Sequence, residues 1–355
     1  MAFGSSSGIT SLGFNQDQGC FSACLKSGLR VYNVDPLVEK THYNIDEIGR
    51  VSICEMIYRT NWLLIVKSCS PSILRILDDG QRTFTAEVHF KSPIRAIRAR
   101  IDRVAVVLSS TVQVLALPTL ERISLLRIPS NTRPLCSMSL SNDVEALQLI
   151  AAPAHRTGSV QLMDISRTVV GSMSSSPAVL GCHQSQLACF TLSGDGLKLA
   201  TASERGTVIR LWDTDKKTKL YELRRGSDYA KVYCISFNVS GSLVCSVSDK
   251  GTMHLWHAQG PYAHVAVAPY VSPDDRRRAR AACAFSGDSV VQTHVCNNAL
   301  FFMAICVINL VLYYFTVVSN NGSFHKFRFS LESRTCYKTE FEYIMQVGDD
   351  VDFVQ

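Results

Sequence analysis

The chain is patterned as a succession of short apolar runs separated by small and polar residues. The run RVAVVLSSTVQVLAL (residues 103–117) is apolar before a Ser-Ser break and begins with alternating polar and apolar positions after it, and LKLATAS (197–203) follows a Gly-Asp-Gly sequence. Alternation with a period of two is typical of β-strands, and Gly, Ser, Asn and Asp between the runs favour tight turns. Because no long stretch shows the period of an amphipathic helix, the pattern predicts an all-β fold of short strands.

Two consecutive stretches of the chain repeat each other. CFTLSGDGLKLATASERGTVIRLWD begins at Cys189 and CISFNVSGSLVCSVSDKGTMHLWH begins at Cys234, an offset of 45 residues. The aligned pairs are Gly196 with Gly241, Thr201 with Ser246, Ser203 with Ser248, Arg205 with Lys250, Gly206 with Gly251, and Thr207 with Thr252. Such a period is typical of β-propeller blades, each made of four antiparallel strands.

Fainter copies of this repeat occur elsewhere. TGSVQLMDIS, from Thr157, and SGLRVYNVD, from Ser27, resemble RGTVIRLWDT, from Arg205, so each is expected to form a third strand with its preceding turn. Trp212-Asp213 stands where a WD repeat closes that strand. Dividing 355 residues by the period gives about seven or eight units. We therefore predict a seven-bladed WD-repeat β-propeller, as one domain over residues 1–340 followed by an acidic tail over 341–355.

Composition narrows the functional classes. With 46% hydrophobic and 19% charged residues, the chain is expected to fold rather than to be mostly disordered. A net charge of +6 is too small to indicate nucleic acid as a partner. The N-terminus MAFGSSSGITSLGF lacks the features of a secretory signal, so the 13 cysteines are expected to be reduced in the cytoplasm. Their spacing does not match a zinc site, and neither metal nor cofactor is expected.

Catalytic motifs are absent from the sequence. There is no Gly-rich phosphate loop with Lys, no Gly-x-Ser-x-Gly elbow and no His-Glu-x-x-His motif. The Gly-Asp-Gly at 194–196 indicates a hairpin turn, Asp78-Asp79 a turn, and Asp349-Asp350 a tail. A binding protein is therefore favoured over an enzyme.

One apolar segment leaves three interpretations open. ALFFMAICVINLVLYYFTVV (299–318) is long enough to cross a bilayer, with Asn309 and Thr316 as its polar interruptions. Its many β-branched and aromatic residues suit buried strands equally well. The third interpretation is a gene-model artefact such as retained intronic sequence, which would leave residues 307–318 as an exposed, aggregation-prone insert.

Several segments together resemble the PROPPIN family, the WD-repeat proteins interacting with phosphoinositides, also called WIPI proteins. They are FNQDQGCFSACLKSGLRVYNVDPL (14–37), VEALQLIAAPAHRTGSVQLMDI (144–165), HQSQLACFTLSGDGLKLATASERGTVIRLWDT (183–214), ELRRGSDYAKVYCISFN (222–238) and NNGSFHKFRF (320–329). The Arg-Arg-Gly motif in this repeat context is the most specific of them. The tail VGDDVDF loosely resembles the fourth WIPI paralogue.

The resemblance implies two sites for phosphatidylinositol 3-phosphate and the 3,5-bisphosphate on the rim of the fifth and sixth blades. Strand alternation is expected to send Arg224 and Arg225 to opposite sides, so that each anchors one pocket. Arginine suits this role because its planar fork donates paired hydrogen bonds to phosphate. The first site would comprise His183, Thr201, Ser203, Arg205, Thr207, Arg210 and Arg224. The second would comprise Arg225, Ser246, Ser248, Lys250, Thr252 and His254.

Structural roles compete at several of these positions. Thr207 and Thr252 are of the type that satisfies local backbone groups in turns, and His183 is suited to a hydrogen-bonded network within a blade. Arg205 and Lys250 could be solvated turn charges. Besides the phosphoinositide effector, a generic propeller scaffold that binds proteins alone stays open.

The resemblance also implies partners and a location. Such an effector recruits autophagy machinery, including a lipid-transfer or scaffold protein, and Asn15 and Asp17 in FNQDQ match a partner-binding motif; a turn-capping role is the alternative. The chain is expected to be a monomer that associates peripherally with phagophore, preautophagosomal or endosomal membranes.

Residues 257–287 correspond to the family's membrane-facing loop in the sixth blade. The residues expected to touch lipid are Tyr262, Val265, Val267, Tyr270, Arg276, Arg277, Arg278 and Arg280. A surface loop that does not insert is the alternative. Because the strand expected to close the sixth blade is not recognisable and an apolar stretch interrupts the seventh, both blades are predicted to be irregular.

Overall fold

The structure is a computed structural model of the whole chain. It describes residues 8–130, 133–141, 143, 145–166, 176–258, 264–269, 281–285, 312–319, 322–330 and 335–344. Residues 345–355 of the predicted acidic tail, residues 299–311 and most of the predicted membrane-facing loop lie outside these ranges.

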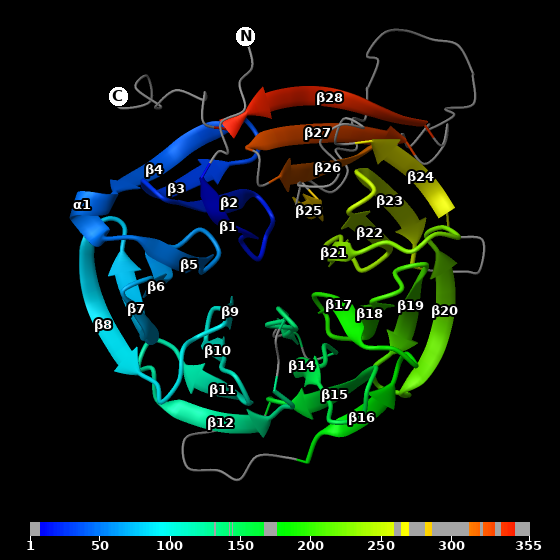
Figure 1. Cartoon of the computed structure of the whole chain (residues 1–355), viewed down its shortest axis with the longest axis horizontal. Helices are drawn as coiled ribbons and strands as arrows, with labels where there is room; N and C mark the ends of the chain where they lie inside the picture. The colour runs from blue at the N-terminus through cyan, green and yellow to red at the C-terminus, as the bar shows by residue number, and fades with distance from the viewer. Residues whose placement is uncertain are drawn as a thin grey trace, which may run out of the picture.

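Within the described residues, the strands form seven four-stranded antiparallel sheets arranged as a ring (Figure 1). Each sheet consists of four strands consecutive in sequence, from the innermost to the outermost. The predicted seven-bladed β-propeller is confirmed.

The first four blades are built from sixteen strands. They are β1 (Ile9–Phe14), β2 (Cys20–Leu25), β3 (Gly28–Asn33) and β4 (Val38–Asn44); β5 (Val51–Met56), β6 (Trp62–Lys67), β7 (Ser70–Asp78) and β8 (Thr83–His89); β9 (Ala96–Ala99), β10 (Arg103–Val107), β11 (Thr111–Ala116) and β12 (Arg122–Arg127); and β13 (Ser137–Met138), β14 (Leu149–Pro153), β15 (Ser159–Asp164) and β16 (Ala178–Gly181). A single helical turn, α1 (Ile45–Ile48), joins the first two blades.

The last three blades follow the same plan. They are β17 (Leu187–Leu192), β18 (Lys198–Ser203), β19 (Val208–Asp213) and β20 (Thr218–Arg224); β21 (Val232–Phe237), β22 (Leu243–Ser248), β23 (Thr252–His257) and β24 (His264–Pro269); and β25 (Ala281–Phe285), β26 (Leu312–Ser319), β27 (Ser323–Ser330) and β28 (Thr335–Tyr343).

The predicted third strands are where the repeated turns placed them. β3, β15 and β19 are each the third strand of a blade, and β19 ends at Asp213 of the Trp-Asp pair. The run at 103–117 forms β10 and β11, and Gly-Asp-Gly lies in the turn between β17 and β18.

The hydrophobic core lies between neighbouring blades. One cluster joins Ala202 and Leu223 of the fifth blade to Phe237 and Trp256 of the sixth. Comparable clusters join the first five blades in turn. Because each apolar sheet face packs on the next sheet, the ends of the strands and their turns stay at the surface.

The described residues correct one prediction near the end of the chain and decide between alternatives for another. β24 and β25 lie within the predicted loop 257–287, and β24 pairs with β23 as the outer strand of the sixth blade. β26 takes up Leu312–Ser319, where Val317 and Val318 are fully buried, which favours the buried-strand interpretation for this part of the apolar segment. Among the described residues, no helix has the length and apolar character to traverse a bilayer.

Candidate anion-binding edge of blades five and six

Three segments meet at one edge of the fifth and sixth blades. They are the β18–β19 turn, the linker from β20 to β21 and the β22–β23 turn. The backbone N–H of Ala230 in the linker donates to the Arg205 carbonyl at 3.1 Å. On the other side, the N–H of Lys231 donates to the Asp249 carboxylate, and the Asp249 N–H donates to the Lys231 carbonyl, both at 3.0 Å. The linker is therefore fixed between the two repeated turns.

Arg224 and Arg225 occupy different environments at this edge. Arg224 ends β20 opposite Val208 and is exposed, and its side chain has no hydrogen-bond or ion-pair partner among the described residues. Arg225 is only 9% exposed: its Nε donates to the Gly206 carbonyl and its Nη2 donates to the Asp228 carbonyl at 2.6 Å. The two guanidinium groups therefore differ in access to solvent, and two N–H groups of Arg225 are hydrogen-bonded to backbone carbonyls.

Burial also acts on the charge of Arg225. It lowers the pKa of the guanidinium, while the carboxylates of Asp249 and Asp228 act in the opposite direction. Arginine stays protonated under such conditions. Arg225 thus contributes a fixed positive charge beneath the linker.

The remaining residues of the first predicted site fall into two groups. His183, Thr201 and Arg210 belong to a network inside the fifth blade. Thr201 is fully buried, and its hydroxyl lies 3.0 Å from His183 Nε2 and accepts the indole N–H of Trp212 at 3.1 Å. Arg210 donates to the Cys182 carbonyl at 2.7 Å and to Glu222 at 2.8 Å.

This network shapes the ionisation of its members. Burial, followed by the charge of Arg210, lowers the pKa of His183 to about 4. The hydrogen bond from Arg210 lowers the pKa of Glu222. His183 is therefore neutral at physiological pH, which suits the structural alternative weighed from the sequence.

The second group lies at the surface turn. Arg205 is exposed, Thr207 is half-buried and Ser203 is buried. The Thr207 carbonyl accepts the N–H of Arg225 at 2.9 Å, so the turn and the Arg-Arg-Gly motif are directly connected.

The second predicted site lies one blade later and likewise combines residues inside the blade with residues at a surface turn. Ser246 and Ser248 are buried in β22, and the Ser246 hydroxyl has no hydrogen-bond partner among the described residues. The Thr252 hydroxyl lies 3.2 Å from His254 Nε2, while the His254 ring stacks on Trp256. Lys250 is exposed at the turn, and its backbone N–H donates to the Ser248 hydroxyl at 3.4 Å.

Comparison with known proteins identifies the family. The PROPPIN family model matches residues 8–264, which include the first five blades and the first three strands of the sixth. The chain belongs to the PROPPIN family.

Relatives of this PROPPIN include two yeast proteins. SVP1-like protein 2 of Pichia angusta is 30% identical over 260 residues, which are 70% of this chain and 69% of that protein. Autophagy-related protein 18 of Komagataella pastoris is 28% identical over 276 residues, which are 68% of this chain and 50% of that protein. The match therefore covers about two thirds of the length of SVP1-like protein 2 and half of the length of autophagy-related protein 18.

Solved structures share the fold of this PROPPIN. Hsv2 of Kluyveromyces lactis gives a TM-score of 0.75 at 17% identity, over 95% of this chain and 99% of that chain. A complex of KlAtg21 with the coiled coil of AgAtg16 also gives a TM-score of 0.75, at 19% identity and the same coverage. At these identities the likeness establishes the β-propeller.

The predicted partner motif of this PROPPIN lies in the β1–β2 turn. Asn15 is buried; its amide donates to the Tyr58 carbonyl at 3.1 Å, and its side-chain oxygen accepts the Cys20 N–H at 3.0 Å. Asp17 pairs with Arg59 at 2.7 Å. Partial burial acts to raise the pKa of Asp17, but the Gly19 N–H and Arg59 hold it below its usual value. Both side chains thus have structural roles in the turn.

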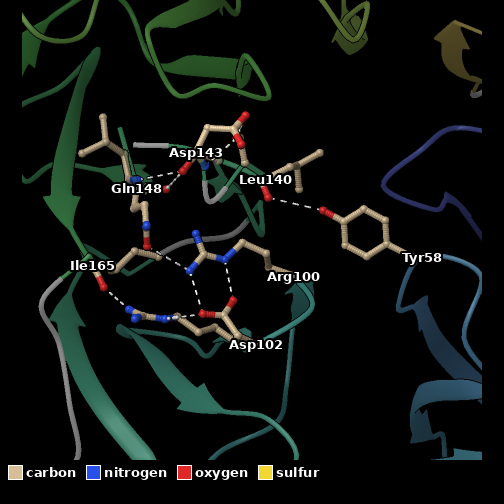
Figure 2. A network of polar contacts seen from close by, with 11 residues as sticks. Tyr58, Arg100, Asp102, Leu140, Asp143, Gln148 and Ile165 are labelled. Carbon is tan, nitrogen blue, oxygen red and sulfur yellow. Dashed lines mark hydrogen bonds and ion pairs between the residues drawn. The ribbon is translucent and has the colours of Figure 1, made fainter. Parts of the chain in front are cut away.

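Sequence reasoning missed a polar network across the second to fourth blades (Figure 2). Arg100 is fully buried and donates to both oxygens of Asp102, at 2.6 and 2.9 Å, and to Gln148 at 3.1 Å. The Tyr58 hydroxyl donates to the Leu140 carbonyl at 3.3 Å. The spacing Arg-x-Asp-Arg at 100–103 was the available signal.

Within the described part of the chain, no group of His, Cys, Asp or Glu is arranged to hold a metal ion.

Proposed function

We propose that this PROPPIN binds phosphatidylinositol 3-phosphate and the 3,5-bisphosphate at the edge of its fifth and sixth blades, without catalysis. The observation that carries the proposal is the junction of the two repeated turns with the Arg-Arg-Gly motif, fixed by the hydrogen bonds of Arg205, Gly206, Arg225 and Asp249. This junction presents Arg205, Arg224 and Lys250 to solvent.

The chemistry of the junction suits phosphate. Arg224 has its guanidinium donors available for paired hydrogen bonds to phosphate oxygens. Arg205 and Lys250, which occupy equivalent positions in the two turns, would add one cation to each site. Thr207 and Thr252 would supply hydroxyls, and Arg225 would act in the second site by fixing the linker and adding charge.

His183, Thr201 and Arg210 contribute to the first site indirectly in this proposal. Their polar atoms contact one another or the blade, so they would position the β18–β19 turn and not the lipid. Ser203, Ser246, Ser248 and His254 would line the sites from below the surface.

Recruitment of autophagy machinery to forming autophagosomal membranes follows as the cellular role. The name of the Komagataella pastoris relative supports a role in autophagy, and the complex of KlAtg21 with the coiled coil of AgAtg16 supports a protein partner. The complex also favours the second candidate, a scaffold that binds proteins, as an accompanying function. Asn15 and Asp17 would then shape the partner surface through the β1–β2 turn.

Flotation with liposomes that contain or lack phosphatidylinositol 3-phosphate tests the lipid proposal. Arg224→Ala is the sharpest variant because Arg224 has no described partner to lose. Removal of the Arg224 side chain is expected to weaken 3-phosphate-dependent binding by about tenfold or more, because a hydrogen bond to a charged group contributes that much to affinity. Arg224→Ala/Arg225→Ala is expected to abolish it.

Arg122→Ala is the matched control, since Arg122 is an exposed arginine on β12 in the third blade. Equal losses in Arg122→Ala and Arg224→Ala would indicate general charge attraction only. Binding that ignores the 3-phosphate would favour the scaffold.

A further inference from the structure

The linker between the fifth and sixth blades carries an exposed aromatic residue that the proposed headgroup sites do not use. Tyr229 is 61% exposed, although the residues on both sides of it are held in place. The Asp228 carbonyl accepts Arg225 Nη2, and the Ala230 N–H donates to Arg205. Tyr229 is thus the tip of a fixed loop, not part of a loosely held segment.

The surroundings of Tyr229 are predominantly basic. Arg205, Arg224, Lys231 and Lys250 are exposed on the linker and the two turns that hold it. The nearby carboxylates are partly engaged: Asp249 accepts the Lys231 N–H, Glu204 pairs with Arg133 at 3.1 Å, and Asp228 accepts the Ser227 hydroxyl. An aromatic side chain at the centre of a basic edge matches an anionic membrane surface.

We propose that Tyr229 is an interfacial anchor that enters the headgroup layer of a bilayer while the flanking basic residues hold anionic lipids. Tyrosine suits this position because its ring is apolar and its hydroxyl stays hydrated. The inference rests on the proposed function, since it places the bilayer against the same edge. It assigns to the linker a membrane contact separate from headgroup recognition.

The rigidity of the linker gives this contact its orientation. Arg225 bonds to Gly206 and Asp228, and Lys231 bonds to Asp249, so ordering the loop costs little further conformational entropy on binding. An anchor between two headgroup sites also raises the effective concentration of each site at the membrane.

The test separates membrane affinity from headgroup affinity. Tyr229→Ala is expected to reduce affinity for liposomes with phosphatidylinositol 3-phosphate about fivefold, the effect of withdrawing a partly buried aromatic side chain from the interface. Its affinity for soluble inositol 1,3-bisphosphate is expected to stay that of the parent. Phe84→Ala is the matched control, because Phe84 is a 39% exposed aromatic on β8, on the opposite side of the ring (Figure 1).

A second variant locates the side chain directly. Tyr229→Trp is expected to show added fluorescence quenching by liposomes with bromines near the glycerol backbone, measured against the parent with its three tryptophans. Unchanged liposome affinity in Tyr229→Ala, or no added quenching in Tyr229→Trp, would overturn the anchor while leaving headgroup binding standing. A loss of inositol 1,3-bisphosphate affinity equal to the liposome loss would make Tyr229 part of a headgroup site instead. Failure of the proposed function would appear separately, as liposome binding that survives Arg224→Ala/Arg225→Ala.

Discussion

At the scale of single residues, His183 links blade structure to proton binding. Its ring lies 3.0 Å from the buried Thr201 hydroxyl, and burial with nearby Arg210 lowers its pKa to about 4. An unfolded chain protonates histidine near pH 6.5. Between about pH 6.5 and 4, His183 is therefore protonated in the unfolded state but not in the folded state. The stability contributed by neutral His183 is lost as the pH falls through this range.

His183→Gln tests this linkage, because glutamine retains an N–H donor but does not titrate. The free energy of unfolding of the parent, relative to the variant, is expected to fall between pH 7 and 5 in urea titrations. The comparison is made against the variant because Glu55, with its pKa raised by burial to about 7, acts in the opposite direction in both proteins. Parallel pH profiles of parent and variant would contradict the expected role of His183.

At the scale of elements, the β18–β19 turn depends on a glycine whose conformation other residues rarely adopt. Gly206 has φ of +62°, and a Cβ there would lie 1.7 Å from the Ala230 carbonyl oxygen. Gly206→Ala is therefore expected to displace the linker, to lower the free energy of unfolding by at least about 1 kcal/mol, and to weaken lipid binding through Arg225.

Gly226, in the Arg-Arg-Gly motif, provides the control for this element. A Cβ at Gly226 meets nothing within 4 Å, so Gly226→Ala is expected to change stability by less than about 0.5 kcal/mol. Urea unfolding and liposome flotation measure both effects. Equal destabilisation by the two variants would mean that the contact between turn and linker does not set the stability of this edge.

The same elements show what the sequence could and could not predict. The third strands β3, β15 and β19 follow from a repeated turn that the chain itself displays. β26 falls in the apolar segment whose composition left buried strands open as one interpretation, whereas β24 was not expected, because its strand character comes from pairing with β23.

The candidate site, too, could be predicted only in part from the sequence. The repeat offset identified Arg205 and Lys250, and they are exposed at equivalent turns. The burial of Arg225 and the position of Tyr229 depend on how the linker lies against both turns, which the sequence alone does not specify.

At the scale of the whole molecule, the described strands close the ring without exchange of strands between blades. Every sheet uses consecutive strands, so the seventh and first blades are joined through side chains. Phe324 of β27 packs against Phe21 of β2 with ring centroids 6.2 Å apart, and the Tyr32 hydroxyl donates to the Ile344 carbonyl at 3.1 Å. Lys326 adds an ion pair with Asp35 at 2.7 Å.

This mode of closure predicts where the propeller opens first. Phe324→Ala is expected to cost about 3–5 kcal/mol, because it leaves a cavity in the cluster that joins the two blades. Tyr32→Phe is expected to cost about 0.5–1.5 kcal/mol through one lost hydrogen bond. In Phe324→Ala, amide hydrogen exchange should quicken in the seventh and first blades well before the third and fourth, because the interfaces of the third and fourth blades keep their own clusters. Uniform acceleration around the ring would instead mean that the propeller unfolds as one cooperative unit, with closure no weaker than any other interface.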